Sequence, residues 1–197
     1  MATHLFDTLQ AGAMRAGLTA RTKESKAWFK KKIKDMGTVN KKALMKDGAT
    51  EVTTNPLPGQ MIMYFYNPKH RKTLPYYDRF PMTIIIQPAP GGFHGLNLHY
   101  LSPGVRARFL DDLMDTAPKN ITDKTRLKIT YDKLNATKKY KEFAPCFKHY
   151  LGSHIKSQMA RVPMTEWEMA VFLPTESFVK VRAETVWRYS RKQYSGK

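Results

Sequence analysis

The sequence of 197 residues contains 34 Lys and Arg against 16 Asp and Glu, a net charge of +18, and 42% of its residues are hydrophobic. This composition excludes a disordered chain, and no apolar run reaches the roughly 18 residues of a membrane span. The single cysteine, Cys146, excludes an internal disulfide and is typical of a protein of the reducing cytosol.

The positive charge lies on both flanks of the chain and spares its centre. Residues 1–48 carry 11 basic and 4 acidic side chains, residues 49–101 carry 4 and 2, and residues 102–197 carry 19 and 10. A field of this sign favours polyanions: nucleic acid, an acidic protein face or a membrane surface. We expect a basic helical segment over residues 1–48 and an α+β domain over residues 49–197, with its central β core at 59–101.

Three helical elements are predicted in the N-terminal segment. Residues 3–17 place Leu5, Leu9 and Ala13 four apart, without a signal-peptide pattern, and Gly17 is suited to end this helix. Residues 22–37 predict a second helix, and residues 40–48 a further helical turn. The second helix is expected to bury one stripe of side chains, namely Ala27, Trp28, Phe29, Ile33 and Met36.

Three strands are predicted in the centre, at residues 59–66, 81–88 and 93–101, each flanked by Pro or Gly. Apolar side chains alternate with polar or small ones along the third strand. Leu96, Leu98 and Tyr100 fall on one face, and Gly95, Asn97 and His99 on the other. We therefore predict an α+β fold: a small twisted antiparallel sheet or SH3-like half-barrel, flanked by N- and C-terminal amphipathic helices.

Helices are predicted to follow the centre. Ser102 as a cap and Pro103 at the first position favour a helix over residues 102–115, which is expected to expose Arg106 and Arg108. Residues 122–143 indicate one or two basic amphipathic helices.

The last third of the chain is harder to assign. Residues 145–163 fit either helix or strand. Thr165 and Glu168 have capping-box spacing, but the residues after them resemble a strand up to residue 174. Residues 175–194 predict a closing helix with Thr175 as its cap.

The sequence gives little support for a catalytic site or a metal site. Cys146, His149 and His154 lack the second close pair of ligands of a structural zinc site, so a core cysteine with surface histidines is favoured. Three carboxylates share the predicted helix after residue 102: Asp111, Asp112 and Asp115. A solvated face with intrahelical ion pairs is favoured over a nuclease site for them. We predict no catalytic residue, no metal and no cofactor.

Basic side chains form the candidate binding surface. A solvated lysine-rich surface is the alternative for any single run, but two runs and the net charge favour contact with phosphates. The candidate residues are Lys26, Lys30, Lys31, Lys34, Lys41, Lys42, Lys124, Arg126, Lys128, Lys138, Lys139, Lys141 and Lys148. Tyr76, Tyr77, Phe80, Gly91 and Gly92 are expected to be structural. The segment "LPYYDRFP" (74–81) is expected to be buried against its sheet and not to form a ligand site.

The stretches "YNPKHRKTLPYYDRFPMTIII" (66–86) and "GGFHGLNLHYL" (91–101) resemble a family of small virion proteins of T-even-type contractile-tailed phages. "FAPCFKHYL" (143–151) and "EMAVFLP" (168–174) extend the resemblance over most of the chain. The best match in this group is the DNA end protector, which coats the end of the packaged genome near the head–tail joint. The resemblance implies no catalytic residue.

The resemblance implies a non-enzymatic virion protein that binds the packaged DNA end through its basic faces. The alternative is a structural adaptor of the phage neck, tail or baseplate that docks acidic subunits without contacting DNA, with Trp28, Trp167 and Trp187 as anchors. An enzyme, most plausibly a nuclease, is the third hypothesis. The expected partners are other virion subunits and double-stranded DNA, with no membrane and no small-molecule substrate. The protein is expected in the virion, after synthesis in the host cytoplasm.

Overall fold

The computed structural model of the protein describes residues 5–19, 22–46, 51–115, 132, 136 and 141–195, and the statements below concern these residues. Its helices are α1 (Leu5–Arg15), α2 (Lys23–Met36), α3 (Lys41–Lys46), α4 (Pro103–Asp115), α6 (Trp167–Ala170) and α7 (Ala183–Ser195). Its strands are β1 (Glu51–Thr53), β2 (Met61–Met63), β3 (Tyr77–Asp78), β4 (Met82–Ala89), β5 (Gly92–Asn97), β6 (Phe147–Leu151), β7 (Met159–Val162) and β8 (Phe178–Val179). Short 3-10 helices are η1 (Leu98–Tyr100), η2 (Lys141–Cys146), η3 (Gly152–His154) and η4 (Met164–Glu166).

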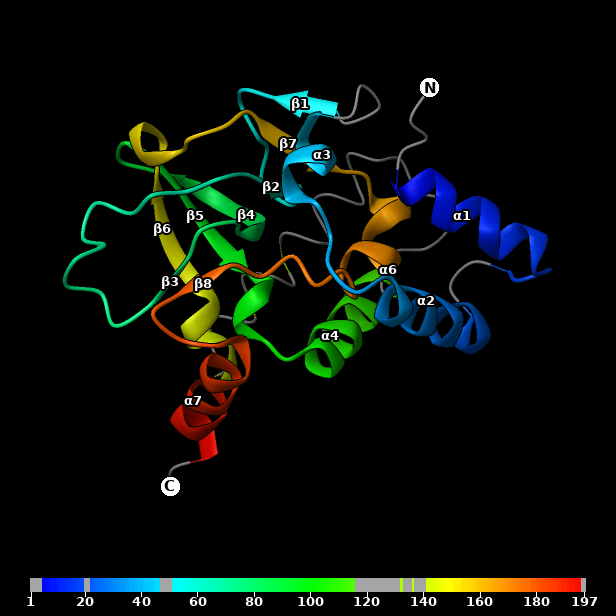
Figure 1. The fold of residues 1–197 in the computed structure, drawn as a ribbon. Helices are drawn as coiled ribbons and strands as arrows, with labels where there is room; N and C mark the ends of the chain where they lie inside the picture. The colour runs from blue at the N-terminus through cyan, green and yellow to red at the C-terminus, as the bar shows by residue number, and fades with distance from the viewer. Residues whose placement is uncertain are drawn as a thin grey trace.

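Six strands pair into one antiparallel sheet in the order β1-β7-β2-β4-β5-β6, and β3 and β8 form a separate antiparallel pair. The α+β class is confirmed, and the sheet is open at β1 and β6. The three predicted strands are its central members β2, β4 and β5, whereas β6 and β7 come from the stretch that fitted either helix or strand. Figure 1 shows α1, α2, α4 and α6 gathered on one side, while α7 stands apart against η1 and η2.

The central strands are buried on both faces of the sheet. Because neighbouring residues of a strand point to opposite sides, each strand contributes side chains to two separate cores. Met61 and Met63 of β2 belong to the larger hydrophobic core, which includes side chains of the surrounding helices. Ile62 and Tyr64 belong to a smaller, mainly aromatic core that includes Tyr150. This double burial explains why β2 and β4 are apolar runs without alternation.

The helix α2 buries Ser25, Phe29 and Ile33, which are spaced by four residues. The predicted stripe was right for Phe29 and Ile33. Ala27 is exposed because it lies on the opposite side of the helix, and Met36 is exposed because it lies in the last turn. The division of the chain after residue 48 stays a prediction, and both α1 and α2 pack against α6 of the larger part.

A buried hydrogen bond joins α2 to α6. Ser25 Oγ donates to Glu168 Oε1 over 2.6 Å, and Ser25 also completes the capping box with Thr22 that starts α2. The predicted capping box of Thr165 and Glu168 is wrong, because Glu168 is drawn into the interior and η4 precedes α6 without a side-chain cap. The predicted strand up to residue 174 is also wrong, since no strand follows α6 before β8.

We expect Ser25→Ala to lower the free energy of unfolding by about 1–3 kcal/mol, because a buried carboxylate loses a hydrogen-bond donor. Urea denaturation followed by circular dichroism measures the change. Ser153→Ala, on the exposed turn of η3, is the control and should stay within about 0.5 kcal/mol of the wild type. Equal effects of the two substitutions would contradict a role for the Ser25–Glu168 bond.

Two further predicted elements were too long. The third central strand ends at Asn97, because its Oδ1 accepts a hydrogen bond from the His99 amide (3.0 Å) and caps η1. The closing helix begins at Ala183, because residues 178–179 pair with β3 instead. Four basic residues just before and along α7 are exposed: Arg182, Arg188, Arg191 and Lys192.

Candidate nucleic-acid interface

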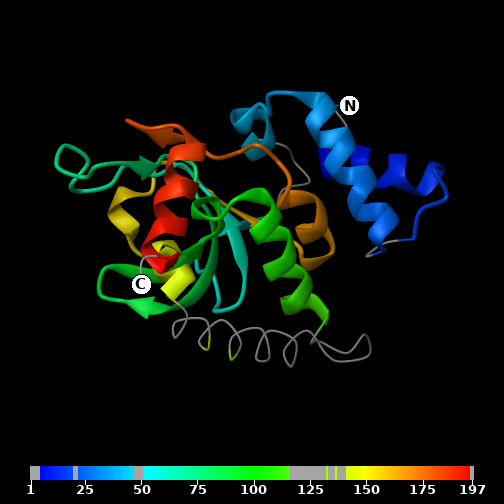
Figure 2. The ribbon, with the colours of Figure 1, turned by 90° about the horizontal axis from the view of Figure 1, so that it is seen from below.

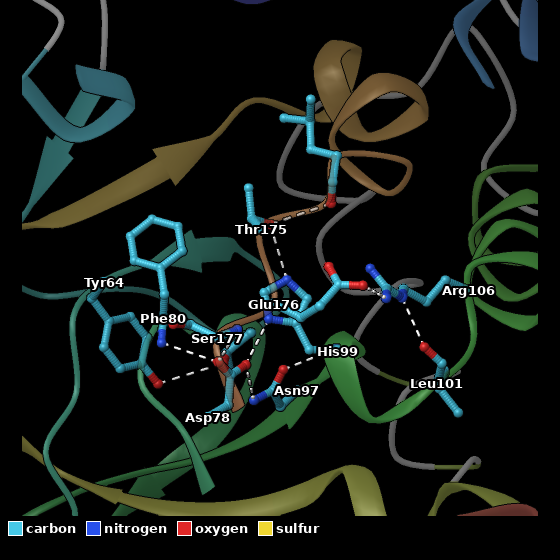
Figure 3. A network of polar contacts seen from close by, with 12 residues as sticks. Tyr64, Asp78, Phe80, Asn97, His99, Leu101, Arg106, Thr175, Glu176 and Ser177 are labelled. Carbon is cyan, nitrogen blue, oxygen red and sulfur yellow. Dashed lines mark hydrogen bonds and ion pairs between the residues drawn. The ribbon is translucent and has the colours of Figure 1, made fainter. Parts of the chain in front are cut away.

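A buried carboxylate, Asp78, holds together three segments that are distant in sequence (Figure 3). Its Oδ1 accepts hydrogen bonds from the amides of Phe80 (3.0 Å) and Ser177 (3.1 Å). Its Oδ2 accepts from Asn97 Nδ2 (3.2 Å) and from His99 Nδ1 (2.6 Å). The network therefore ties β3 to the end of β5 and to the segment that leads into β8.

The pKa of Asp78 is lowered from its ordinary 3.8. Burial alone raises it, but the charge and hydrogen bond of His99, with the hydrogen bonds from Phe80 and Asn97, outweigh this effect. The carboxylate is thus ionised at neutral pH, and its lone pairs are engaged by the network.

The series Asp78, His99 and Thr175 has the order of a catalytic triad, with His99 Nε2 and Thr175 Oγ1 3.0 Å apart. The three residues are 4%, 0% and 0% exposed, so no substrate can reach the hydroxyl. The backbone of His99 is pinned as well, since Trp187 Nε1 donates to its carbonyl oxygen (2.9 Å). We interpret the series as structural, and Thr175 is part of it instead of capping the closing helix.

Arg106 extends the buried polar region, contrary to its predicted exposure. Its side chain is 1% exposed, with Nε donating to the Leu101 carbonyl (2.8 Å) and NH2 to Glu176 Oε1 (2.9 Å). The guanidinium also lies 5.7 Å from the centroid of the Trp187 ring. Burial alone raises the pKa of Glu176, but the charges of Arg106 and His99 outweigh it and the net shift is downward.

A pocket of about 400 Å³ adjoins this network, and Asp78 forms part of its wall. The loop over residues 67–76 supplies Lys69 and His70 to the lining, and β6 supplies Lys148 and His149. Tyrosines, including Tyr77 and Tyr100, complete the wall. The pocket thus combines basic groups with aromatic rings, which is the chemistry of a nucleic-acid site.

The loop over residues 67–76 is held in place at both ends. Asn67 donates its amide to the His154 carbonyl (3.0 Å), and its own carbonyl lies 2.8 Å from His154 Nδ1. At the other end, Lys180 Nζ donates to the carbonyl oxygens of Lys72 (3.0 Å) and Leu74. This wall of the pocket is therefore formed before any ligand binds.

Lys148 is the most enclosed cation of the pocket. Its Nζ lies 4.3 Å from the centroid of the Tyr100 ring. Burial lowers its pKa below the ordinary 10.5, and the nearby Cys146 acts in the opposite direction. In the part of the chain that the structure describes, no carboxylate forms an ion pair with Lys148.

The predicted basic residues fall on separate surfaces. Lys30, Lys31, Lys34 and Lys42 are exposed on α2 and α3, and Lys41 is half-buried. Lys26 forms an ion pair with Asp111 of α4 instead (2.7 Å). The helix α2 and the strand β6, which carries Lys148, lie on opposite sides of the molecule in Figure 1 and Figure 2. The other candidates lie outside the described residues or have side chains outside them: Lys124, Arg126, Lys128, Lys138, Lys139 and Lys141.

Sequence reasoning named Lys148 as a candidate but missed the basic loop that also lines the pocket. Residues 67–77 contain Lys69, His70, Arg71 and Lys72 and no acidic residue. The charge count over residues 49–101 combined these four basic residues with the uncharged strands, so the local excess of positive charge was not visible. A charge count over this loop alone would have detected the run.

The segment 74–81 is only partly core. Asp78, Phe80 and Pro81 are buried as expected. Tyr76 and Tyr77 are half-buried and line the pocket, because the preceding loop stands off the sheet (Figure 1). The expectation that the whole segment packs against the sheet was therefore too broad.

The proposed tryptophan anchors are occupied within the chain. Trp167 is 1% exposed, and its Nε1 donates to the Val162 carbonyl (3.0 Å). Trp187 is half-buried against Arg106, and Trp28 is half-buried beside Phe29. Trp167 therefore cannot anchor a docking partner, and this part of the adaptor hypothesis is wrong.

The structure also places the residues weighed for metal and covalent chemistry. Cys146 is fully buried, as expected of a core cysteine, and burial raises its pKa to about 12. Asp111 pairs between helices with Lys26 and not within α4. Among the described residues, no three or more His, Cys, Asp or Glu side chains form a group that could hold a metal ion. Within the same ranges, none of the helices has the length and apolar character needed to cross a membrane.

Comparison with known proteins bears on the whole chain. The model of the family described as Phage T4 terminal DNA protecting protein matches residues 3–193. No curated protein and no solved structure matches. The match covers α2, the buried network and the pocket alike.

Proposed function

The chain belongs to the family of the Phage T4 terminal DNA protecting protein, and on this premise we propose that it is a non-enzymatic virion protein that binds the end of the packaged DNA. The observation that supports DNA as the ligand is the net charge of +18, with exposed lysines on α2. The burial of the Asp78–His99–Thr175 series supports a role without catalysis, because its hydroxyl is closed to substrate.

The outer face of α2 suits contact with the phosphate backbone. Lys30 and Lys34 lie one helical turn apart, Lys31 is beside them, and all three are exposed. The acidic residues of the same helix, Glu24 and Asp35, fall to one side of this face. Flexible lysines that contact phosphates bind without reading bases, so the binding should not depend on sequence.

The proposed setting is the phage particle. The protein is made in the host cytoplasm and takes its place near the head–tail region, where other virion subunits are its neighbours. The exposed basic residues of α7, including Arg188 and Lys192, provide a second surface for an acidic subunit or for further phosphates.

The DNA proposal is tested by fluorescence anisotropy on a short blunt duplex over a series of salt concentrations. We expect the combined substitution of Lys30, Lys31 and Lys34 by Gln to weaken binding equally for unrelated sequences. The log–log salt slope should become shallower by about 0.9 for each phosphate that the variant no longer neutralises.

The matched control neutralises the two acidic residues of the same helix, with Glu24→Gln and Asp35→Asn. This control should bind DNA at least as tightly as the wild type, because it raises the net charge. Absence of DNA binding by the wild-type protein at low salt would refute the proposed function. If the lysine variant and the control weaken DNA binding equally, the lysines of α2 are not the DNA-binding face.

A further inference from the structure

We propose that the pocket between the loop over residues 67–76 and β6 receives the 5′-terminal nucleotide of a DNA strand, with its 5′-phosphate at Lys148 and its base against Tyr77. This inference rests on the proposed function, because it specifies how the end of a DNA molecule is distinguished from its interior.

The first observation is the cation. The ammonium of Lys148 lies against the Tyr100 ring inside the pocket, and no ion pair engages it among the described residues. A phosphate oxygen would supply the missing negative charge. Lys69 and His70 on the loop also line the pocket and place further polar groups at its wall, whereas His149 Nε2 is engaged by the Pro90 carbonyl (3.1 Å).

The second observation is an aromatic ring without an aromatic partner. Tyr77 lines the pocket and is half-buried, and within the described ranges its ring makes no contact with another ring. By contrast, Tyr76 is stacked on Tyr189, with ring centroids 6.3 Å apart and an interplanar angle of 18°. A nucleobase can stack on a free tyrosine ring, and such stacking is tolerant of sequence.

The third observation is the nearby carboxylate. Asp78 also borders the pocket and would repel a phosphate if its charge were uncompensated. Its oxygens are instead engaged by His99, Asn97 and two backbone amides, and these donors offset part of its charge. The groups of the lining that can contact an anion directly are Lys148, Lys69 and His70.

The size of the pocket favours a strand end over the interior of a duplex. A volume of about 400 Å³ lies in the range of sites for single small ligands and is too small for a stacked duplex. An internal nucleotide must break stacking on both sides to enter, whereas a terminal nucleotide is stacked on one side only. The terminal nucleotide therefore has the smaller unstacking cost.

The test compares two DNA ligands of the same sequence with the full-length protein. One is a blunt duplex with 5′-phosphates, and the other is a dumbbell whose ends are closed by polyethylene glycol linkers. The variants are Tyr77→Leu, which keeps an apolar side chain, and Lys148→Met, which keeps the length of the stem. Tyr77→Trp is the conservative control, because it preserves a ring for stacking. Thermal melting confirms that each variant is folded.

We expect the wild-type protein to bind the open duplex more tightly than the dumbbell by roughly tenfold, the scale of one base stacked on an aromatic side chain. Tyr77→Leu and Lys148→Met should each remove most of this preference and leave dumbbell binding within about twofold of the wild type. Tyr77→Trp should retain the preference. Removal of the 5′-phosphates should lower the affinity for the open duplex, and a free deoxynucleoside 5′-monophosphate should compete for that component alone.

The outcomes separate this inference from the proposed function. Equal binding of the open duplex and the dumbbell, or a preference that survives both pocket variants, would overturn the pocket assignment while DNA binding itself stands. Failure to bind either ligand would overturn both proposals. A preference unaffected by the 5′-phosphate would refute the placement of the phosphate at Lys148.

Discussion

Replacing Asp78 by Ala is expected to lower the free energy of unfolding by about 3–5 kcal/mol, because several buried hydrogen-bond donors lose the same charged acceptor. The substitution removes the acceptor of the His99 ring, of one Asn97 N–H and of two backbone amides, and the side chains of Asn97 and His99 are fully buried. A buried donor that loses its acceptor costs free energy because water replaces the lost hydrogen bond poorly in the interior. Urea denaturation at neutral pH measures the effect.

Asp35→Ala is the matched control for this experiment. Asp35 is exposed on α2, so its removal should change the unfolding free energy by less than about 0.5 kcal/mol. If the variant without Asp78 is as stable as the wild type, the buried network does not hold β3, β5 and the β8 segment together.

The same carboxylate predicts a dependence of stability on pH. The pKa of Asp78 is lower in the folded protein than its ordinary 3.8, so its contribution is present above that value and is lost as the pH falls through the folded pKa. We expect Asp78→Asn to be destabilised at neutral pH but to lose less further stability below about pH 4 than the wild type does. Parallel acid-unfolding curves for the two proteins would contradict this assignment.

Replacing Gly92 by Ala is expected to have the second large effect, a loss in the free energy of unfolding of about 3 kcal/mol, the upper end of the usual cost of overpacking. A Cβ at this position would lie 1.8 Å from the Tyr150 carbonyl oxygen. That atom belongs to the backbone of β6, which pairs with β5 and contributes Lys148 to the pocket. The clash can be relieved only by separating the two strands. We therefore expect lower stability and a displaced pocket wall.

Gly104→Ala is the control, because it makes the same chemical change where nothing lies within 4 Å of the new Cβ. Gly104 lies in α4, so this substitution should be neutral or stabilise the protein by about 0.4–1 kcal/mol. Thermal melting of the two variants provides the comparison. If the Gly92→Ala protein has the same melting temperature as the wild type, β5 and β6 are not packed as described.

Local patterns were sufficient where one neighbouring interaction decides the structure. Gly17 and Gly37 follow the first two helices with φ of 69° and 67°, conformations that glycine adopts without strain. Leu9 and Ala13 are four residues apart, so they lie on one face of the helix, and both are in the core. The α+β class and the central strands β2, β4 and β5 followed from the same kind of evidence.

The patterns failed where a distant partner outweighed a local preference. Thr175 has the chemistry of a helix cap, but a hydrogen bond with His99 holds it in the buried network. Glu168 fits a capping box, but its carboxylate bonds to Ser25, far away in sequence. Arg106 lies on an amphipathic helix and was expected in solvent, but Glu176 compensates its charge in the interior.

The sequence by itself determined the net charge, the ends of the first two helices, the central strands and the resemblance to phage DNA end protectors, because each depends on composition or on residues close in the chain. Only the tertiary structure decided which basic groups share a site. It separated Lys148 from the lysines of α2, paired Lys26 with Asp111, and brought Lys148 to the same pocket as Lys69 and Tyr77. These contacts join residues that are far apart in sequence. Which distant segments come together depends on the competition between all possible partners, and a local sequence pattern contains no information about that competition.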